Sequence, residues 1–182
     1  VQNNYLRDGF YAFNKDQEIQ SQLTVQFLEK IVDVTEEVEA GVKGLSWADR
    51  IKKIQEVYKS ITDKVADKEN GISGRVYSMF KDNQYIMYVY KTYRDIRLVG
   101  TPPESVGKFG GDTDNWEWPR HTGDFSIFRV YAAKDGKPAA YSKDNVPLKP
   151  KHFLPVSIKG IKDGDYAMIY GYPGGTNRYE TS

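Results

Sequence analysis

The sequence predicts a mostly β protein with one long helix, and three observations support this class. Aromatic residues make up 14% of the chain and include 14 Tyr, and aromatic rings pack well on the pleated face of a sheet. Several short segments alternate apolar and polar side chains, which is the period of a half-buried strand. One longer segment instead repeats its apolar residues at helical spacing. Short strands separated by turn signals favour a barrel or a sandwich.

The first half of the chain contains one predicted strand and the helix. Residues 1–22 are polar and aromatic, and we expect an extended loop with a short turn there. Residues 23–35 (LTVQFLEKIVDVT) begin with strict alternation and predict a strand. Ser46 is a good helix N-cap. Apolar residues at helical spacing then predict a helix over residues 47–67, closed by Asn70–Gly71.

A dense β region follows the helix. The segments ISGRVYSMF and QYIMYVYKTY are separated by KDN and predict a hairpin. YRDIRLVG is a third strand, which Thr101-Pro102-Pro103 interrupts. Residues 125–133 (FSIFRVYAA) predict another strand, followed by a turn at KDGKP. The segments KHFLPVSIKG and DYAMIYGYP predict two more strands towards the end of the chain.

Composition excludes several classes of function. The net charge of +1 gives no global field that would favour nucleic acid or an anionic membrane. No apolar run approaches the roughly 20 residues that cross a bilayer. The chain has no Cys, which removes disulfides, cysteine-ligated zinc and thiol nucleophiles. Val1 is not an initiator Met and the chain stops abruptly at NRYETS, so we expect a fragment of a longer protein.

The run GGDTDNWEWPRHTGDFSIFRVY concentrates acidic, aromatic and basic residues in one loop before a strand. Functional groups gather on loops that a rigid scaffold holds. The acids Asp112, Asp114 and Glu117, with Asn115, suggest a calcium loop, but Trp116 stands at the third ligand position and no glycine follows it. An acidic turn with local Asx hydrogen bonds is therefore favoured over a metal site.

The other chemical groups of the chain are ambiguous by themselves. Trp116 and Trp118 would share one face of an extended strand, either as an aromatic binding platform or as packing, and composition favours packing. His121 and Asp124 lie three residues apart, whereas triad members usually come from distant parts of a fold, so a structural pair is favoured. His152 has no evident partner, and no serine lies in a nucleophile elbow. The chain alone holds no complete nucleophile, base and acid.

The segment SVGKFGGDTDNWEWPRHTGDFSIFRVYA resembles the signature region of the bacterial dipeptidyl-peptidase family that includes dipeptidyl peptidases 7 and 11. YLRDGFYA, LTVQFLEKIVDVT and YGYPGGTNRYETS resemble further family segments in the same order, so the resemblance covers nearly the whole chain. It implies a serine exopeptidase with a chymotrypsin-like double β-barrel into which a helical domain is inserted. Residues 1–182 would then be an incomplete part of the catalytic domain, mostly β with one long helix.

The resemblance also implies roles for individual residues. Asp124 corresponds to the triad aspartate, while the catalytic histidine would precede Val1 and the serine would follow the chain. Asn115 and Trp116 correspond to residues that bind the free N-terminus of a peptide substrate. An Asn carbonyl can accept hydrogen bonds from an ammonium group. We expect Asp124 to be buried and rigidly held, with Gly123 permitting a close approach and unusual backbone angles.

The same resemblance implies no metal and no organic cofactor, peptide substrates with a free N-terminus, a periplasmic or cell-surface location in a bacterium, and a homodimeric parent. Two positions depart from the family pattern. Glu117 stands where an apolar residue is usual, and Gly175 where a basic residue is common. Glu117 would place a charge beside the substrate subsite, where it bears on the fine specificity.

Two other interpretations stay open at this point. The chain could be a β-rich carbohydrate-binding module that uses Trp116, Trp118 and the Tyr-rich strands as stacking surfaces, or a purely structural β-domain. An exposed aromatic platform would favour the module. A buried Trp116 and open sheet edges would favour the peptidase fragment, which should be inactive by itself because it lacks base and nucleophile.

Overall fold

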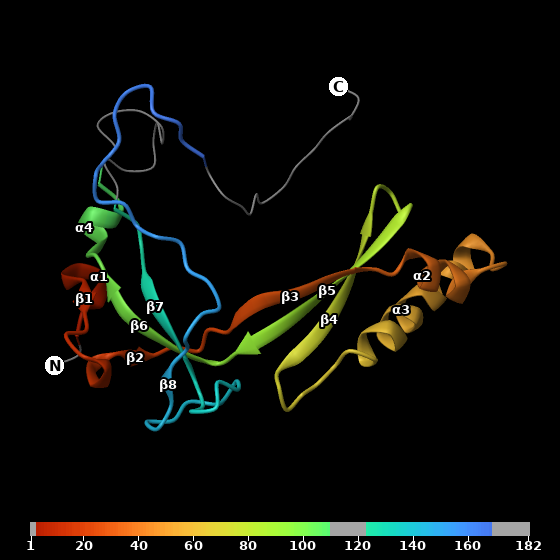
Figure 1. Cartoon of the computed structure of the whole chain (residues 1–182), viewed down its shortest axis with the longest axis horizontal. Coiled ribbons are helices and arrows are strands. Elements are labelled where there is room, and N and C mark those ends of the chain that lie inside the picture. Colours follow the sequence, from red (N-terminus) through yellow and green to blue (C-terminus); the bar gives the residue numbers. More distant parts are fainter. Residues whose placement is uncertain (1–2, 110–122, 169–182) are drawn as a thin grey trace. The chain divides into compact units, whose positions relative to one another are not determined.

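The computed structural model describes residues 3–109 and 123–168 (Figure 1). The chain divides into two units, residues 1–149 and 150–182. Helical segments of the first unit are α1 (Tyr5–Asp8), the 3-10 turn η1 (Lys15–Gln17), α2 (Thr35–Val42), α3 (Trp47–Asp63) and α4 (Glu104–Gly107). Its strands are β1 (Phe10–Tyr11), β2 (Ile19–Gln20), β3 (Val25–Asp33), β4 (Ile72–Met79), β5 (Gln84–Tyr93), β6 (Asp95–Thr101), β7 (Ile127–Ala132) and β8 (Val146–Pro147).

The strands form two antiparallel sheets. One has the order β3-β5-β4, and the other has the order β1-β6-β7-β8 with β2 also paired to β6. The β-rich class predicted from the sequence is therefore confirmed, as are the hairpin and the strands at residues 93–100 and 125–133. The hairpin turns through Phe80, Lys81 and Asp82, which all have positive φ, and the Asn83 side chain donates to the Phe80 carbonyl at 2.6 Å.

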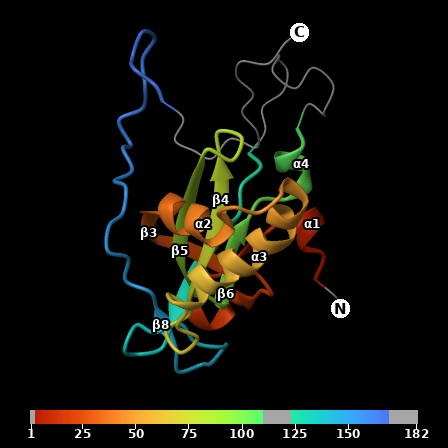
Figure 2. The ribbon, with the colours of Figure 1, turned by 90° about the vertical axis from the view of Figure 1, so that its right-hand side faces the viewer.

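Helices α2 and α3 cover one face of the β3-β5-β4 sheet (Figure 2). The core between them contains Tyr85, Met87 and Val89, which alternate along β5, and it also contains Val38 and Ile61 from the two helices. Burying a side chain of this size stabilises the fold by about 1.5–3 kcal/mol. The alternating apolar side chains of β5 and the helically spaced apolar side chains of α3 therefore pack together in this cluster.

The sequence correctly predicted the start of α3 but not its end. The Ser46 hydroxyl accepts a hydrogen bond from the Asp49 backbone N–H at 3.2 Å, as an N-cap should. The helix ends at Asp63 rather than 67, and Asn70–Gly71 leads into β4 instead of closing the helix. A turn at Asp67 causes the difference, because its carboxylate accepts hydrogen bonds from both the backbone and the side chain of Asn70.

Two other sequence predictions were wrong or incomplete. A single helix was expected, but α2 forms a second one, and it buries Val38 and Val42, which lie four residues apart. The loop expected over residues 1–22 contains α1, β1 and β2. Residues 151–160 form no strand, and neither do residues 165–168, the described part of the other predicted strand. The described residues of the second unit are exposed, Ile158 at 97% for example, and alternation without a hydrogen-bonded neighbour does not make a strand.

Candidate functional site

The described part of the predicted site is a cleft beside Asp124, with a volume of about 430 Å³. Asp124 lies three residues before β7 begins. The cleft walls come from α1, the end of β6, α4 and the residues entering β7, with apolar contributions from Leu6, Pro103 and Phe125. A mostly apolar cleft with a few polar groups is the usual form of a small-molecule or peptide-side-chain site.

Local backbone contacts fix the chain on each side of Asp124. The Gly123 N–H donates to the Val106 carbonyl of α4 at 3.1 Å. The Thr101 hydroxyl at the end of β6 donates a long hydrogen bond of 3.4 Å to the Phe125 carbonyl. The prediction that Gly123 permits a close approach is correct, since an added Cβ would lie 3.1 Å from Val106 Cγ1. Its φ is not positive, so the expected unusual backbone angle is absent.

The Asp124 side chain is exposed within this chain, whereas we expected a buried carboxylate. The residues that contact its neighbours belong to α4 and the end of β6. The structure does not describe the other predicted site residues, Asn115 and Trp116. Glu117, Trp118 and His121 also lie outside the described residues, as does Gly175. His152 is exposed in the second unit.

A buried pair of charged residues lies at the opposite end of β6. Asp95 is fully buried and Arg97 is 6% exposed. The Arg97 guanidinium donates to both Asp95 carboxylate oxygens, at 2.9 and 2.7 Å, and to the Ser142 carbonyl at 2.8 Å. It lies between the rings of Tyr131 and Tyr141, 3.7 and 4.7 Å from their centroids.

Asp95 also accepts a hydrogen bond of 2.8 Å from the Asn145 side chain. Burial raises the pKa of Asp95, but the hydrogen bonds from Arg97 and Asn145 outweigh it and hold this pKa below its ordinary value. Burial and a hydrogen bond donated to Glu18 raise the pKa of Tyr131 to about 12. Each charged group of this cluster has a partner, so the cluster is a structural anchor for the loop after β7. Sequence reasoning missed it, although Asp-x-Arg within one strand places both side chains on the same face.

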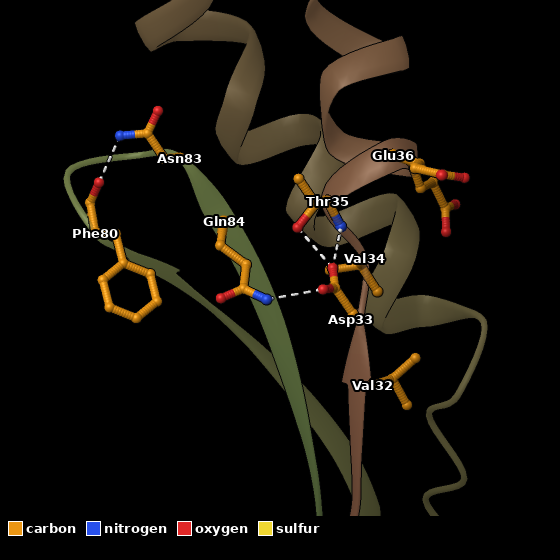
Figure 3. A pocket seen from close by; sticks show the side chains of 9 residues that line it. Val32, Asp33, Val34, Thr35, Glu36, Phe80, Asn83 and Gln84 are labelled. Atoms are coloured by element: carbon orange, nitrogen blue, oxygen red, sulfur yellow. Dashed lines mark hydrogen bonds between the residues drawn. The ribbon is translucent and has the colours of Figure 1, made fainter.

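Another hollow in the described chain is an open groove of about 1120 Å³ where β3 meets α2 (Figure 3). Its central carboxylate, Asp33, accepts hydrogen bonds from the Thr35 backbone and hydroxyl, at 2.9 and 2.6 Å, and from the Gln84 side chain at 2.9 Å. These bonds, the one from the Thr35 hydroxyl first, hold the Asp33 pKa below its ordinary value. The Asp33 carboxylate thus ties the end of β3 to the start of α2 and is itself fully engaged in hydrogen bonds.

Two negative observations concern the described residues alone. No helix among them is long and apolar enough to cross a membrane. The described ranges also contain no group of three or more His, Cys, Asp or Glu side chains placed to hold a metal ion.

Comparisons with known proteins agree on one family. The chain is 50% identical over 98% of its length to an Asp/Glu-specific dipeptidyl-peptidase of Capnocytophaga gingivalis, of which it covers 25%. It is 50% identical over its full length to dipeptidyl-peptidase 7 of Porphyromonas gingivalis, of which it covers 26%. Among solved structures, that of Porphyromonas endodontalis DPP11 in complex with the dipeptide Arg-Asp matches 91% of this chain with a TM-score of 0.79 and 43% identity, and the match covers 25% of that protein.

The chain thus spans about a quarter of the length of the curated relatives that it matches. The sequence model of the peptidase S46 family matches residues 1–182. Together with relatives at this level of identity, that match places the chain in the peptidase S46 family.

Proposed function

We propose that this chain is a segment of the catalytic domain of a serine dipeptidyl peptidase, and that Asp124 is the aspartate of its catalytic triad. The whole protein would release dipeptides from the N-terminus of peptides by acyl transfer. Serine would attack the peptide carbonyl, histidine would take its proton, and the aspartate would orient the histidine and stabilise the imidazolium. Residues 1–182 would be an incomplete domain, part of a chymotrypsin-like double β-barrel.

The observation that carries the proposal is the position of Asp124. The carboxylate stands at an apolar cleft, at the entrance to a central strand of the β1-β6-β7-β8 sheet, in a chain of the peptidase S46 family. A triad aspartate needs an anchored backbone and a side chain available to an imidazole. Its exposure in this chain leaves the carboxylate accessible to a histidine supplied by another part of the protein.

The remaining roles rest on the family resemblance. Asn115 would accept hydrogen bonds from the substrate ammonium, and Trp116 would form a wall of the same subsite. The solved relative binds the dipeptide Arg-Asp, and for this protein we propose peptides with a free N-terminus as substrates. We further propose a homodimer in the periplasm or at the bacterial cell surface.

The decisive experiment is the Asp124→Asn variant of the full-length protein. Asn keeps the shape of the side chain but stabilises the wrong imidazole tautomer, so kcat should fall by about 10⁴-fold. The assay is release of a chromogenic group from dipeptide amides. A loss of less than tenfold would remove Asp124 from the triad. Asp165→Asn, at an exposed position of the second unit, is the matched control and should leave kcat unchanged.

A carbohydrate-binding module is not favoured. The Tyr77, Tyr88 and Tyr90 side chains do form a ring series on β4 and β5, with centroids 5.5 and 6.3 Å apart. The matching family is a peptidase family, and the relatives that align with nearly all of this chain are named as peptidases. Titration with oligosaccharides should accordingly give no saturable change in Tyr fluorescence.

A further inference from the structure

The short helix α4 contacts the chain directly before Asp124. It is a compact turn, because the Val106 and Gly107 N–H groups both donate to the Pro103 carbonyl, at 2.9 and 3.1 Å. The Gly123 N–H donates in turn to the Val106 carbonyl. The residue adjacent to the carboxylate is therefore tied to α4 through its backbone.

Gly123 packs closely against the Val106 side chain. A methyl group at Gly123 would lie 3.1 Å from Val106 Cγ1, so either the Val106 side chain or one of the two segments would have to move by a few tenths of an ångström. A methyl group at Gly107 would lie 3.9 Å from the Asp124 Cα and Cβ, an ordinary van der Waals distance. Gly107 of α4 therefore lies near Asp124, with space for a methyl group between them.

We propose that Val106 and Gly123 are positioning residues for Asp124, and that α4 sets where its carboxylate stands. This inference rests on the proposed function of Asp124. It assigns a task to a four-residue turn that contributes no residue to the proposed triad. A displacement of about 1 Å of a catalytic group can cost 10²-fold in rate, so a few tenths of an ångström should cost about tenfold.

The test uses Gly123→Ala in the full-length protein. We expect kcat for dipeptide amides to fall about tenfold while KM stays unchanged, because the substrate amine would be bound elsewhere. A displaced aspartate also stabilises the imidazolium less, which lowers the histidine pKa. Since the base acts in its neutral form, the acidic limb of the kcat/KM profile should move to lower pH. A purely structural loss would not move that limb.

Two further variants isolate the contact. Val106→Ala removes the methyl group that would clash, so Val106→Ala/Gly123→Ala should recover kcat to within about threefold of wild type. Gly41→Ala makes the same kind of clash elsewhere, because its new methyl would lie 2.8 Å from Val57 Cγ2. It should lower the melting temperature and leave kcat per folded molecule unchanged.

The inference is overturned if Gly123→Ala keeps kcat within twofold, or if the double variant does not recover. Asp124→Asn, measured in parallel, separates this failure from that of the proposed function. If Asp124→Asn loses activity 10⁴-fold while Gly123→Ala stays fully active, only the positioning role of Val106 and Gly123 is refuted. If the Asp124→Asn enzyme is active, both this role and the proposed function of Asp124 are refuted. If Gly123→Ala does not fold, Val106→Ile can replace it, because it crowds the same contact with one extra methylene. Val106→Ile should lower kcat about threefold, and an unchanged kcat would refute the positioning role.

Discussion

The buried pair of Asp95 and Arg97 provides the sharpest stability prediction. In Arg97→Met, the carboxylate of Asp95 would stay buried with only part of its hydrogen bonds. The guanidinium would no longer hold the Ser142 carbonyl, which it meets at 2.8 Å, or lie between Tyr131 and Tyr141. Removing one partner of a buried ion pair costs about 3–5 kcal/mol. Methionine fills much of the same volume, so the cost is mainly electrostatic.

This cost should appear first in the loop that the pair anchors. The Asn145 N–H donates to the Ser142 carbonyl at 3.2 Å and the Leu148 N–H to the Val130 carbonyl at 2.8 Å. If the loop opens locally before the sheet does, exchange of these amides reports its opening free energy. At tenfold per 1.4 kcal/mol, a loss of 3–5 kcal/mol should accelerate their hydrogen exchange by about 10²- to 10³-fold or more.

Hydrogen exchange followed by mass spectrometry of the full-length protein measures this change. Arg97→Lys is the matched control, because it keeps the positive charge but loses the planar, two-pronged geometry, and it should give an intermediate acceleration. Amides of β5, such as Met87 in the core below α3, should be unaffected. Acceleration of less than tenfold at Asn145 and Leu148 in Arg97→Met would refute the assignment of the pair as the anchor of this loop.

The remaining predictions concern other parts of the chain. Asn115→Ala should raise KM for free-amine dipeptide substrates without a matching change for N-acetylated ones, and equal effects on both would mean that the residue only shapes its loop. Ser46→Ala should destabilise the protein by about 1 kcal/mol through loss of the α3 cap, measured by urea unfolding against Ser60→Ala as a control. Gly71→Ala should cost about 1–3 kcal/mol, because φ is +67° there and a methyl group would meet the Thr92 carbonyl at 2.9 Å, and an unchanged midpoint would contradict this. The Asp95 pKa lies below its ordinary value of 3.8, so its contribution to stability is complete above that pH and is lost as pH falls through the folded-state pKa. Protection of the Asn145 amide, which is its exchange rate corrected for the intrinsic pH dependence of amide exchange, should therefore fall in acid in the wild type, and a flat protection profile between pH 5 and about 2 would argue against it.

The sequence correctly predicted those elements whose pattern of apolar residues matches the segments that pack against them. Strand β5 is read correctly because Tyr85, Met87 and Val89 alternate into a core that α3 completes, and α3 begins where its Ser46 cap stands. Helix α2 was missed because it has only two turns and starts at the end of a strand without a side-chain cap. The segment at 151–160 shows the opposite error, since its alternation has no neighbouring strand to pair with.

Prediction of the candidate site had a different limit. The family resemblance selected Asp124, but the contacts that hold it come from residues with no chemical signature, Val106 and Thr101. The Asp95 and Arg97 anchor was equally invisible, because its partners Tyr141 and Asn145 lie more than forty residues later in the sequence. Long-range pairing of this kind follows from the sheet register, which the sequence pattern does not specify.

Strand β6 carries both the buried anchor and the residues next to the candidate site, which raises the question of whether the two are coupled. Asp95 pairs with Tyr131 at one end, and Gly100 pairs with Ile127 at the other, with a register shift between Leu98 and Gly100. A bulge disrupts the hydrogen-bond ladder locally and bends the strand, and we expect it to separate the two ends of β6. Loosening the loop through Arg97→Met should therefore leave kcat of the full-length enzyme within about twofold, whereas Gly123→Ala changes kcat without accelerating exchange at Asn145. If either variant both lowered kcat and accelerated exchange at Asn145, the bulge would not separate the two ends. Strand β6 would then couple the buried ion pair to the candidate site.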